Sequence, residues 1–135
     1  MTKFKLIPTI LVAFIFHEAH AGNVVVIGHA GLSNMDERTV QRIFTGKMIE
    51  IDGLHVTAVN HKTGGLRDRF LQRYLGQNND EYTAYWMVRR FIGKGVPPRE
   101  LSNTIEVIRF VQTTPGAIGY IDESELKTGI NVISR

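Results

Sequence analysis

Apolar residues follow two patterns along this chain: short β-branched runs, and longer stripes at helical spacing. The short runs fall at residues 23–29, 55–60, 117–121 and 130–134. The first reads NVVVIGH and the second HVTAVN. Runs rich in Val and Ile that are bounded by turn residues are typical of buried strands. The pattern therefore predicts four strands.

Between the strands, apolar residues recur three and four positions apart, which predicts four helices. Turn and cap residues mark the expected helix starts: Asn34, which lies three residues before Glu37, then Lys62-Thr63-Gly64-Gly65, Asn79 or Asp80, and Ser102 or Asn103. In the first, second and fourth helices the stripes expected to face the core are Val40, Ile43, Phe44; Phe70, Leu71, Tyr74, Leu75; and Val107, Ile108, Val111.

The third helix carries two candidate faces. Its regular stripe, which we expect to face the core, is Ala84, Met87, Val88, Phe91 and Ile92. One face round, Tyr82, Trp86 and Arg89 form a line of the residue types that dominate protein interfaces. A single Trp in a small domain is more often buried, so we favour the core for Trp86 and keep this line as a possible partner face.

Strands that alternate with helices predict an α/β domain with a mainly parallel sheet covered on both faces, which is a single three-layer lobe. Ligands of such sheets bind beyond the carboxyl ends of the strands. The loops at those ends are residues 29–34 and 61–65, and we expect them to lie on one face.

The first 21 residues have the order of a secretory signal peptide. Lys3 and Lys5 precede an apolar run from Leu6 to Phe16, and Ala19-His20-Ala21 supplies small residues at the cleavage site. The run is shorter than the roughly 20 residues that span a bilayer. An amphipathic or buried first helix is the alternative. We expect cleavage after Ala21 and a periplasmic protein.

Composition narrows the possible functions. Cleavage would leave 114 of the 135 residues, enough for one domain at 22–135. No cysteine is present, so disulfides and thiolate chemistry are excluded. Without Lys3, Lys5 and Glu18 the chain keeps 14 basic and 12 acidic residues, a net charge of +2. That excess does not indicate nucleic-acid binding.

The turn before the second helix is the most informative candidate site. Gly64 and Gly65 allow close approach of a ligand to the backbone, and the helix start offers unpaired N–H groups. Thr63, Lys62 and Arg67 would add a hydroxyl, a point charge and a guanidinium. The spacing is not that of a P-loop. An ordinary turn and an anion site are equally compatible with this motif.

Other chemistry has less support. His29 and His61 end neighbouring predicted strands, so a two-histidine metal site is conceivable, but no third ligand has a convincing spacing. No nucleophile elbow and no zinc-protease motif occurs. We expect no catalytic residue, no metal and no cofactor.

Segments along the whole mature chain carry a family resemblance. They are Asn34–Glu37, Arg42–Lys47, His61–Phe70, Tyr85-Trp86, Phe91–Gly95, Pro97-Pro98 and Thr114–Tyr120. On these segments the chain resembles small phosphate-binding-protein-like members of the type 2 periplasmic binding protein superfamily. It resembles in particular the second lobe of the phosphate-binding component of the ABC phosphate transporter.

The resemblance implies that Thr63 to Arg67, with Gly64, Gly65 and Leu66 between them, is the phosphate-contacting loop. The family presents Asp-Gly-Ser-Gly-Thr there, with an Arg shortly before. Here Thr63 stands at the Asp, Gly65 at the Ser, Arg67 at the Thr and His61 at the Arg. Backbone donors survive these changes, whereas the side-chain donor set does not, and the length suffices for one lobe only.

Two functions are therefore expected. The first is a periplasmic phosphate or oxyanion-binding module related to ABC transporter substrate-binding proteins, with His61 and Lys62 assisting the loop. The second is an interaction or scaffold protein that docks on a sensor, porin or envelope machine. In both, a second copy or another protein would complete the site. We expect it to dock around residues 29–34 and 61–67, with the Tyr82, Trp86 and Arg89 line in reserve. We expect no nucleic acid and, after cleavage, no membrane span.

Overall fold

The computed structural model describes residues 2–13 and 22–135. Residues 2–13 contain no helix or strand. The expected cleavage site, Ala19-His20-Ala21, lies outside the described residues, so signal cleavage stays a prediction. Within the described residues no helix has the length and apolar character needed to cross a membrane.

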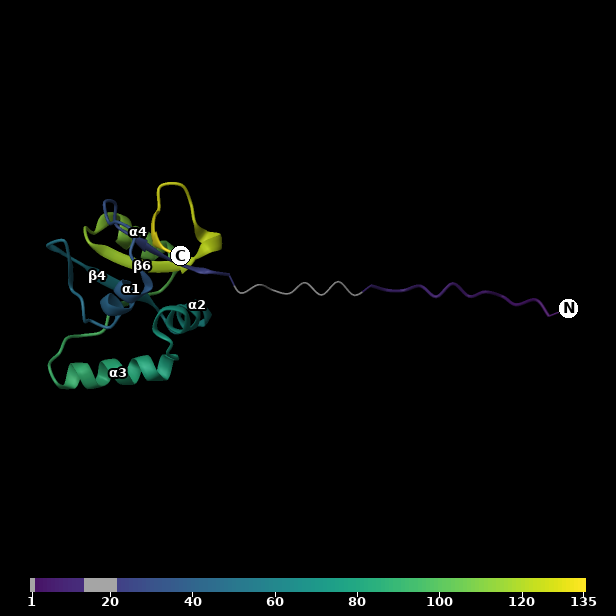
Figure 1. Ribbon diagram of the computed structural model, residues 1–135, viewed down its shortest axis with the longest axis horizontal. Helices are drawn as coiled ribbons and strands as arrows, with labels where there is room; N and C mark the ends of the chain where they lie inside the picture. The colour runs from purple at the N-terminus through teal and green to yellow at the C-terminus, as the bar shows by residue number, and fades with distance from the viewer. Residues whose placement is uncertain (1, 14–21) are drawn as a thin grey trace.

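A five-stranded sheet forms the centre of the domain (Figure 1). Its order is β5 (Arg99–Leu101), β4 (Thr57–His61), β6 (Ala117–Asp122), β1 (Val24–Gly28) and β7 (Asn131–Ser134). β4 pairs in parallel with β5 and β6, whereas β1 pairs antiparallel with β6 and β7. Four of these five strands therefore run the same way, which confirms the mainly parallel α/β sheet.

Side chains alternate across this sheet and build a core on each face. In β1, Val24 and Val26 belong to one core, and Val25 and Ile27 to the other. The first core includes buried residues of α1 (Glu37–Phe44), α2 (Gly65–Phe70), the π-helical turn η1 (Leu71–Leu75) and α3 (Asn79–Phe91). The second includes Val107 and Val111 of α4 (Thr104–Thr113). Helices cover both faces, as expected for a three-layer lobe.

Several short elements were not expected from the sequence. They are β5 and the hairpin of β2 (Glu50–Ile51) with β3 (Leu54–His55). A 3-10 turn, η2 (Glu123–Glu125), follows β6. The expected cap of the fourth helix at Asn103 is confirmed, but α1 is capped by Asp36 rather than Asn34, and α3 by Asn78. Neighbouring Asn and Asp residues have similar capping ability, so sequence alone does not select among them.

The direction of β1 overturns the expected single ligand face. His29 follows β1, and its N–H donates to the carbonyl of Ala117 at 2.9 Å, beside the start of β4 at Thr57. His61 is the last residue of β4 and therefore lies at the opposite end of the strands. The loops at 29–34 and 61–65 therefore lie at opposite ends, because an apolar run encodes a buried strand but not its direction. The two histidines cannot share a metal ion.

The face that α3 buries is also different from the expected one. Tyr82 and Trp86 are buried, so the core assignment of Trp86 is confirmed. The regular stripe of Met87, Val88, Phe91 and Ile92 is exposed. α3 lies along one side of the domain and contacts it through one face (Figure 1). The expectation that this stripe faces the core was wrong, since spacing defines a face without saying what covers it.

Candidate functional site

The turn Lys62–Gly64 joins the carboxyl end of β4 to α2 and is exposed. Gly64 occupies the N-cap position of α2 in extended conformation and makes no side-chain cap bond, whereas Asp36, Asn78 and Asn103 cap the other three α-helices. The N–H of Asp68 is the first to find an acceptor in this helix, the carbonyl of Gly64 at 2.9 Å. The amides before it have no acceptor within the helix.

Space around the turn is open. A β-carbon added to Gly64 would come no closer than 3.9 Å to a neighbouring atom, and one on Gly65 no closer than 3.7 Å. Neither position has a φ in the left-handed region. The two glycines are therefore not required by crowding or by backbone conformation. They leave the amides accessible to a ligand.

Arg67 lies behind the turn rather than in it. Its side chain is buried, and Nη1 donates to the carbonyl of His61 at 3.1 Å and to Oε1 of Glu100 at 2.7 Å. The guanidinium also lies over the ring of Tyr82, 5.5 Å from its centroid. These contacts tie α2 to β4 and β5 and hold the last residue of β4 in place.

His61 likewise points into the domain. Its Nε2 lies 2.7 Å from the carbonyl oxygen of Tyr120, and its backbone N–H donates to the Tyr120 hydroxyl at 3.2 Å. Burial lowers the pKa of the His61 imidazole, an effect that the bond to Tyr120 partly opposes. The neutral ring is the form that the folded protein favours.

The structure thus brings together only part of the predicted anion site. Exposed Lys62 and Thr63, the amides of Gly64 and Gly65, and half-buried Leu66 lie on one turn. The side chains of Arg67 and His61 are placed behind it. What gathers at the surface is a set of backbone donors with one lysine and one hydroxyl.

A buried polar network that the sequence reasoning missed supports the end of β4. The Tyr120 hydroxyl donates to Oδ1 of Asn60 at 2.6 Å, Nδ2 of Asn60 donates to the Tyr82 hydroxyl at 3.2 Å, and that hydroxyl donates to the carbonyl of Phe44 at 2.9 Å. Burial raises the pKa of Tyr82 to about 12, and that of Tyr120 further still. An Asn at the end of an apolar run was the available signal.

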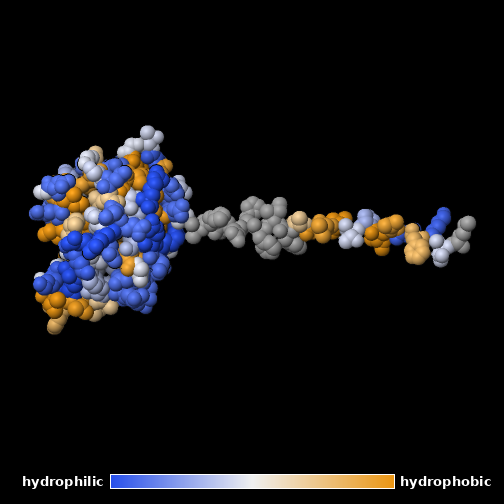
Figure 2. Space-filling model, viewed as in Figure 1, coloured by the Kyte–Doolittle hydropathy of each residue, from blue (hydrophilic) through white to orange (hydrophobic). Residues whose placement is uncertain are grey.

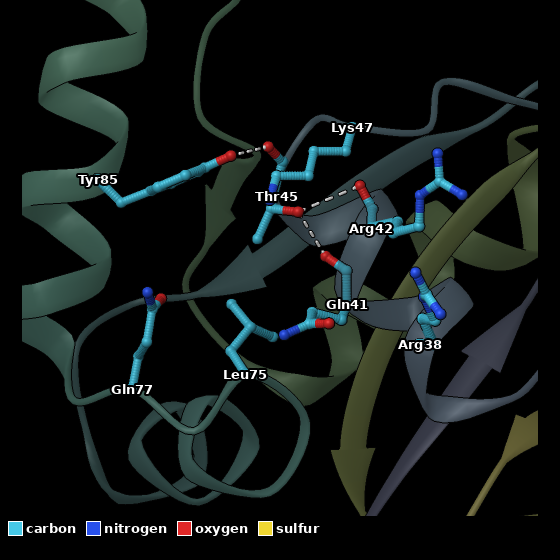
Figure 3. Close-up of a pocket in the computed structure, with 8 residues that line it drawn as sticks. All are labelled: Arg38, Gln41, Arg42, Thr45, Lys47, Leu75, Gln77 and Tyr85. Atoms are coloured by element: carbon cyan, nitrogen blue, oxygen red, sulfur yellow. Dashed lines mark hydrogen bonds between the residues drawn. The ribbon is translucent and has the colours of Figure 1, made fainter.

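Apart from the turn, a hollow lies between α1, η1 and α3 (Figure 3). It measures about 250 Å³, and Arg38, Arg42 and Lys47 line it with Gln77 and Tyr85. The Tyr85 hydroxyl donates to the carbonyl of Thr45 at 2.6 Å, as Figure 3 shows. Arg42 in the last turn of α1 and Lys47 beyond it suit the negative end of the helix dipole, whereas Arg38 lies in the first turn. Helix electrostatics therefore explains two of the three basic residues without a ligand.

In the part of the chain that the structure describes, His29 and the acidic residues form no metal centre. One ring nitrogen of His29, Nδ1, lies 2.9 Å from the carbonyl oxygen of Val111. Within residues 2–13 and 22–135 no three His, Asp or Glu side chains gather where they could hold a metal ion. The ordinary, hydrogen-bonded interpretation of His29 fits the structure.

Comparison with known proteins identifies the fold. No family model matches the sequence, and no relative is found among curated proteins. Solved structures do match. A protein described as a phosphate ABC transporter substrate-binding protein from Clostridium perfringens, with bound phosphate, aligns at a TM-score of 0.65 and 19% identity over 83% of this chain and 44% of its own.

Two further structures agree. An ABC-type phosphate transport receptor from Vibrio cholerae matches at a TM-score of 0.64 and 11% identity, over 83% of this chain and 45% of the receptor. PstS from Borrelia burgdorferi matches at a TM-score of 0.62 and 17% identity, over 84% of this chain and 47% of its own. This domain has the fold of half a phosphate-binding protein. The predicted type 2 binding-protein fold is therefore confirmed, and the chain spans less than half the length of each matched protein.

Acid should weaken this phosphate-binding-protein fold through His61. Because burial lowers the pKa of His61 in the folded state, the unfolded chain binds more protons below the ordinary histidine value of about 6.5. The free energy of unfolding should therefore fall between pH 7.5 and 5, by at most about 1.4 kcal/mol per pH unit from this one group. Urea unfolding across this range measures the loss.

The matched variants for this prediction are His61→Gln and His55→Gln. His61→Gln should flatten the pH dependence, whereas replacing exposed His55 should leave it unchanged. An equally steep fall in His61→Gln would show that other groups cause it.

Proposed function

We propose that this domain binds an inorganic oxyanion, phosphate by default, at the turn Lys62–Gly64 and the first residues of α2, Gly65 and Leu66. The observation that carries the proposal is the uncapped start of α2: three other helices close their first turn with a side chain, and this one leaves its amides open beside Lys62 and Thr63. Amides at a helix start and the positive end of its dipole favour an anion.

The proposed roles follow from placement. Backbone N–H groups from Gly64 to Arg67 cradle the anion, the Thr63 hydroxyl donates, and Lys62 supplies charge. Arg67 acts from behind, because its bond to the His61 carbonyl holds the turn while its own charge is buried and paired with Glu100. The fold shared with phosphate-binding proteins supports this position, and the proposed class is a binding protein rather than an enzyme.

The affinity should be low. One exposed turn meets the anion on one side, and water screens each charge-assisted bond on the other. We expect dissociation constants near millimolar, or about 4 kcal/mol of binding free energy. Added neutral salt should weaken binding further, because an open site is screened.

Gly65 provides a sharp test, since it is the first residue of α2. Gly65→Pro removes one amide donor at the position where proline is best tolerated in a helix, and Gly64 before it is already extended. We expect this variant to lose at least about fivefold in phosphate affinity, or about 1 kcal/mol. Isothermal titration of phosphate and sulfate measures the change.

The control is Gly65→Ala, which keeps the N–H and adds a methyl group with 3.7 Å of clearance. It should bind phosphate like the unaltered protein. Equal affinity of both variants and the parent would place any anion elsewhere on the domain. No binding by the parent at about ten times the expected constant would end the proposal.

The proposed location is the periplasm. The charge, apolar run and small residues of positions 1–21 support export. N-terminal sequencing of protein from the periplasmic fraction should find Gly22 at or near the start. Soluble, phosphate-binding protein that retains Met1 would contradict export by cleavage.

A further inference from the structure

The outward face of α3 is an apolar surface that nothing in the described residues covers. It consists of Met87, Val88 and Phe91 of α3 with Ile92 and Val96 just after it, and these residues are 69%, 61%, 91%, 57% and 69% exposed. Figure 2 shows apolar atoms gathered over the end of α3 that leads into the following loop. Clustered exposure of this size marks an interaction surface more often than a solvated helix face.

A groove runs beside this surface. It has a volume of about 460 Å³, and its lining includes Thr83, Trp86, Met87, Phe91 and Pro97. Most of that lining is apolar. Charged residues, among them Arg90 and Glu100, complete the lining, and Phe91 is the most exposed residue of the surface.

Charge divides along the same helix. Asp80 and Glu81 stand in its first turn, Arg90 stands in its last turn, and Lys94 lies in the loop just after it. Among the described residues, none of these four is in an ion pair. A copy of α3 laid antiparallel would match acid with base at both ends, and would also oppose the two helix dipoles.

We propose that this surface binds a second copy of the chain, with two α3 helices packed antiparallel about a twofold axis near Met87. In that register residue 80 faces residue 94 of the partner, and residue 84 faces residue 90. Small Ala84 gives room beside the groove, and Phe91 of each copy enters the groove of the other near Thr83. Such a contact is self-complementary, as a twofold interface requires.

The same charges argue against a lipid surface as the occupant. An anionic membrane would attract Arg90 and Lys94 but repel Asp80 and Glu81 on the same helix. The interface is small, since α3 is 13 residues long, so the dimer should be weak and dependent on concentration.

Sedimentation velocity of the protein as recovered from cells, with its ends established by mass spectrometry, tests the proposal. A shift from monomer to dimer is expected between about 5 and 500 µM, and Phe91→Asp should raise the dissociation constant at least about tenfold. Ile105→Asp is the control, because Ile105 is also 69% exposed but lies on α4. Monomer throughout that range, or equal effects of both variants, would overturn the proposal.

Charge reversal tests the register. Asp80→Lys and Lys94→Asp should each weaken the dimer severalfold, and the double variant should recover most of the loss because the two pairs re-form with opposite sign. No recovery would contradict the antiparallel register. Because the chain has no cysteine, Met87→Cys adds a single thiol at the proposed axis, and oxidation should give a disulfide dimer that Ile105→Cys does not give.

Phosphate affinity separates this proposal from the anion site. Phe91→Asp should leave the phosphate affinity unchanged. If one of the two proposals fails, the other therefore still stands. Vesicles of anionic phospholipid should not bind the protein. Binding to them that Phe91→Asp abolishes, with no dimer in solution, would assign the surface to a membrane instead.

Discussion

Tyr120→Phe should lower the free energy of unfolding by about 2–4 kcal/mol, since it removes one oxygen on which two buried groups depend. The Tyr120 hydroxyl donates to Oδ1 of Asn60 and accepts the N–H of His61. Both groups would be left without that partner in the buried interior, where Asn60 and Tyr120 are 1% and 0% exposed. Urea unfolding at pH 7.5 measures the loss.

Tyr74→Phe is the matched control. The Tyr74 hydroxyl lies 3.0 Å from the Ser134 hydroxyl in a partly buried pair, where water can reach either group after the change. We expect a loss of about 1 kcal/mol or less. Equal losses of unfolding free energy in the two variants would mean that the Asn60 network stabilises the domain no more than a partly buried hydrogen bond does.

Gly116→Ala should destabilise the domain by about 4 kcal/mol or more, near the upper limit for a single substitution. A β-carbon at this position would lie 2.1 Å from the backbone carbonyl oxygen of His55, which cannot move without displacing the strand it leads into. Its φ of +75° adds the cost of a left-handed conformation. Thermal and urea unfolding report the change.

Gly53→Ala isolates the collision. Gly53 has a similar φ of +79°, but no atom lies within 4 Å of its added β-carbon. Its replacement should cost only the conformational strain, about 1–2 kcal/mol. If the two variants lose the same stability, the close approach of the Gly116 segment to His55 is not what requires glycine there.

The positions of the main elements could be predicted because each has a strong local signal. Val24 to Gly28 is β-branched and bounded by polar residues, and the Thr114-Pro115-Gly116 sequence could only end a helix. Directions could not be predicted in the same way. β1 is antiparallel to both of its neighbours, β6 and β7. Its direction depends on which strands it pairs with, and that pairing joins residues far apart in the sequence.

Faces were less predictable than elements. The apolar stripe through Met87 and Phe91 is regular, yet Tyr82 and Trp86 face the core. Both aromatic rings fill the space beside α1, and the Tyr82 hydroxyl also donates to the carbonyl of Phe44 there. An apolar stripe on a helix predicts that another surface covers it. In the described residues, no other part of the domain covers the stripe of α3.

The candidate turn was located from the sequence, but its side chains were not placed correctly. Glycines before a helix predicted accessible amides, which the structure has. Arg67 looked like an anion ligand because charged residues beside such turns often are. Its acceptor, Glu100, comes from β5, a strand with no signal in the sequence, so the ion pair that holds Arg67 behind the turn could not be foreseen.

Phosphate titration followed by NMR of the backbone amides tests the central claim most directly. Saturable shifts should be largest for Thr63, Gly64, Gly65 and Leu66, with one dissociation constant near millimolar that rises with added sodium chloride. The first turns of α1, α3 and α4 should stay unchanged, because the side chains of Asp36, Asn78 and Asn103 each already accept from one amide there. Shifts that are absent from the turn, or that center instead on Arg38, Arg42 and Lys47, would contradict the account.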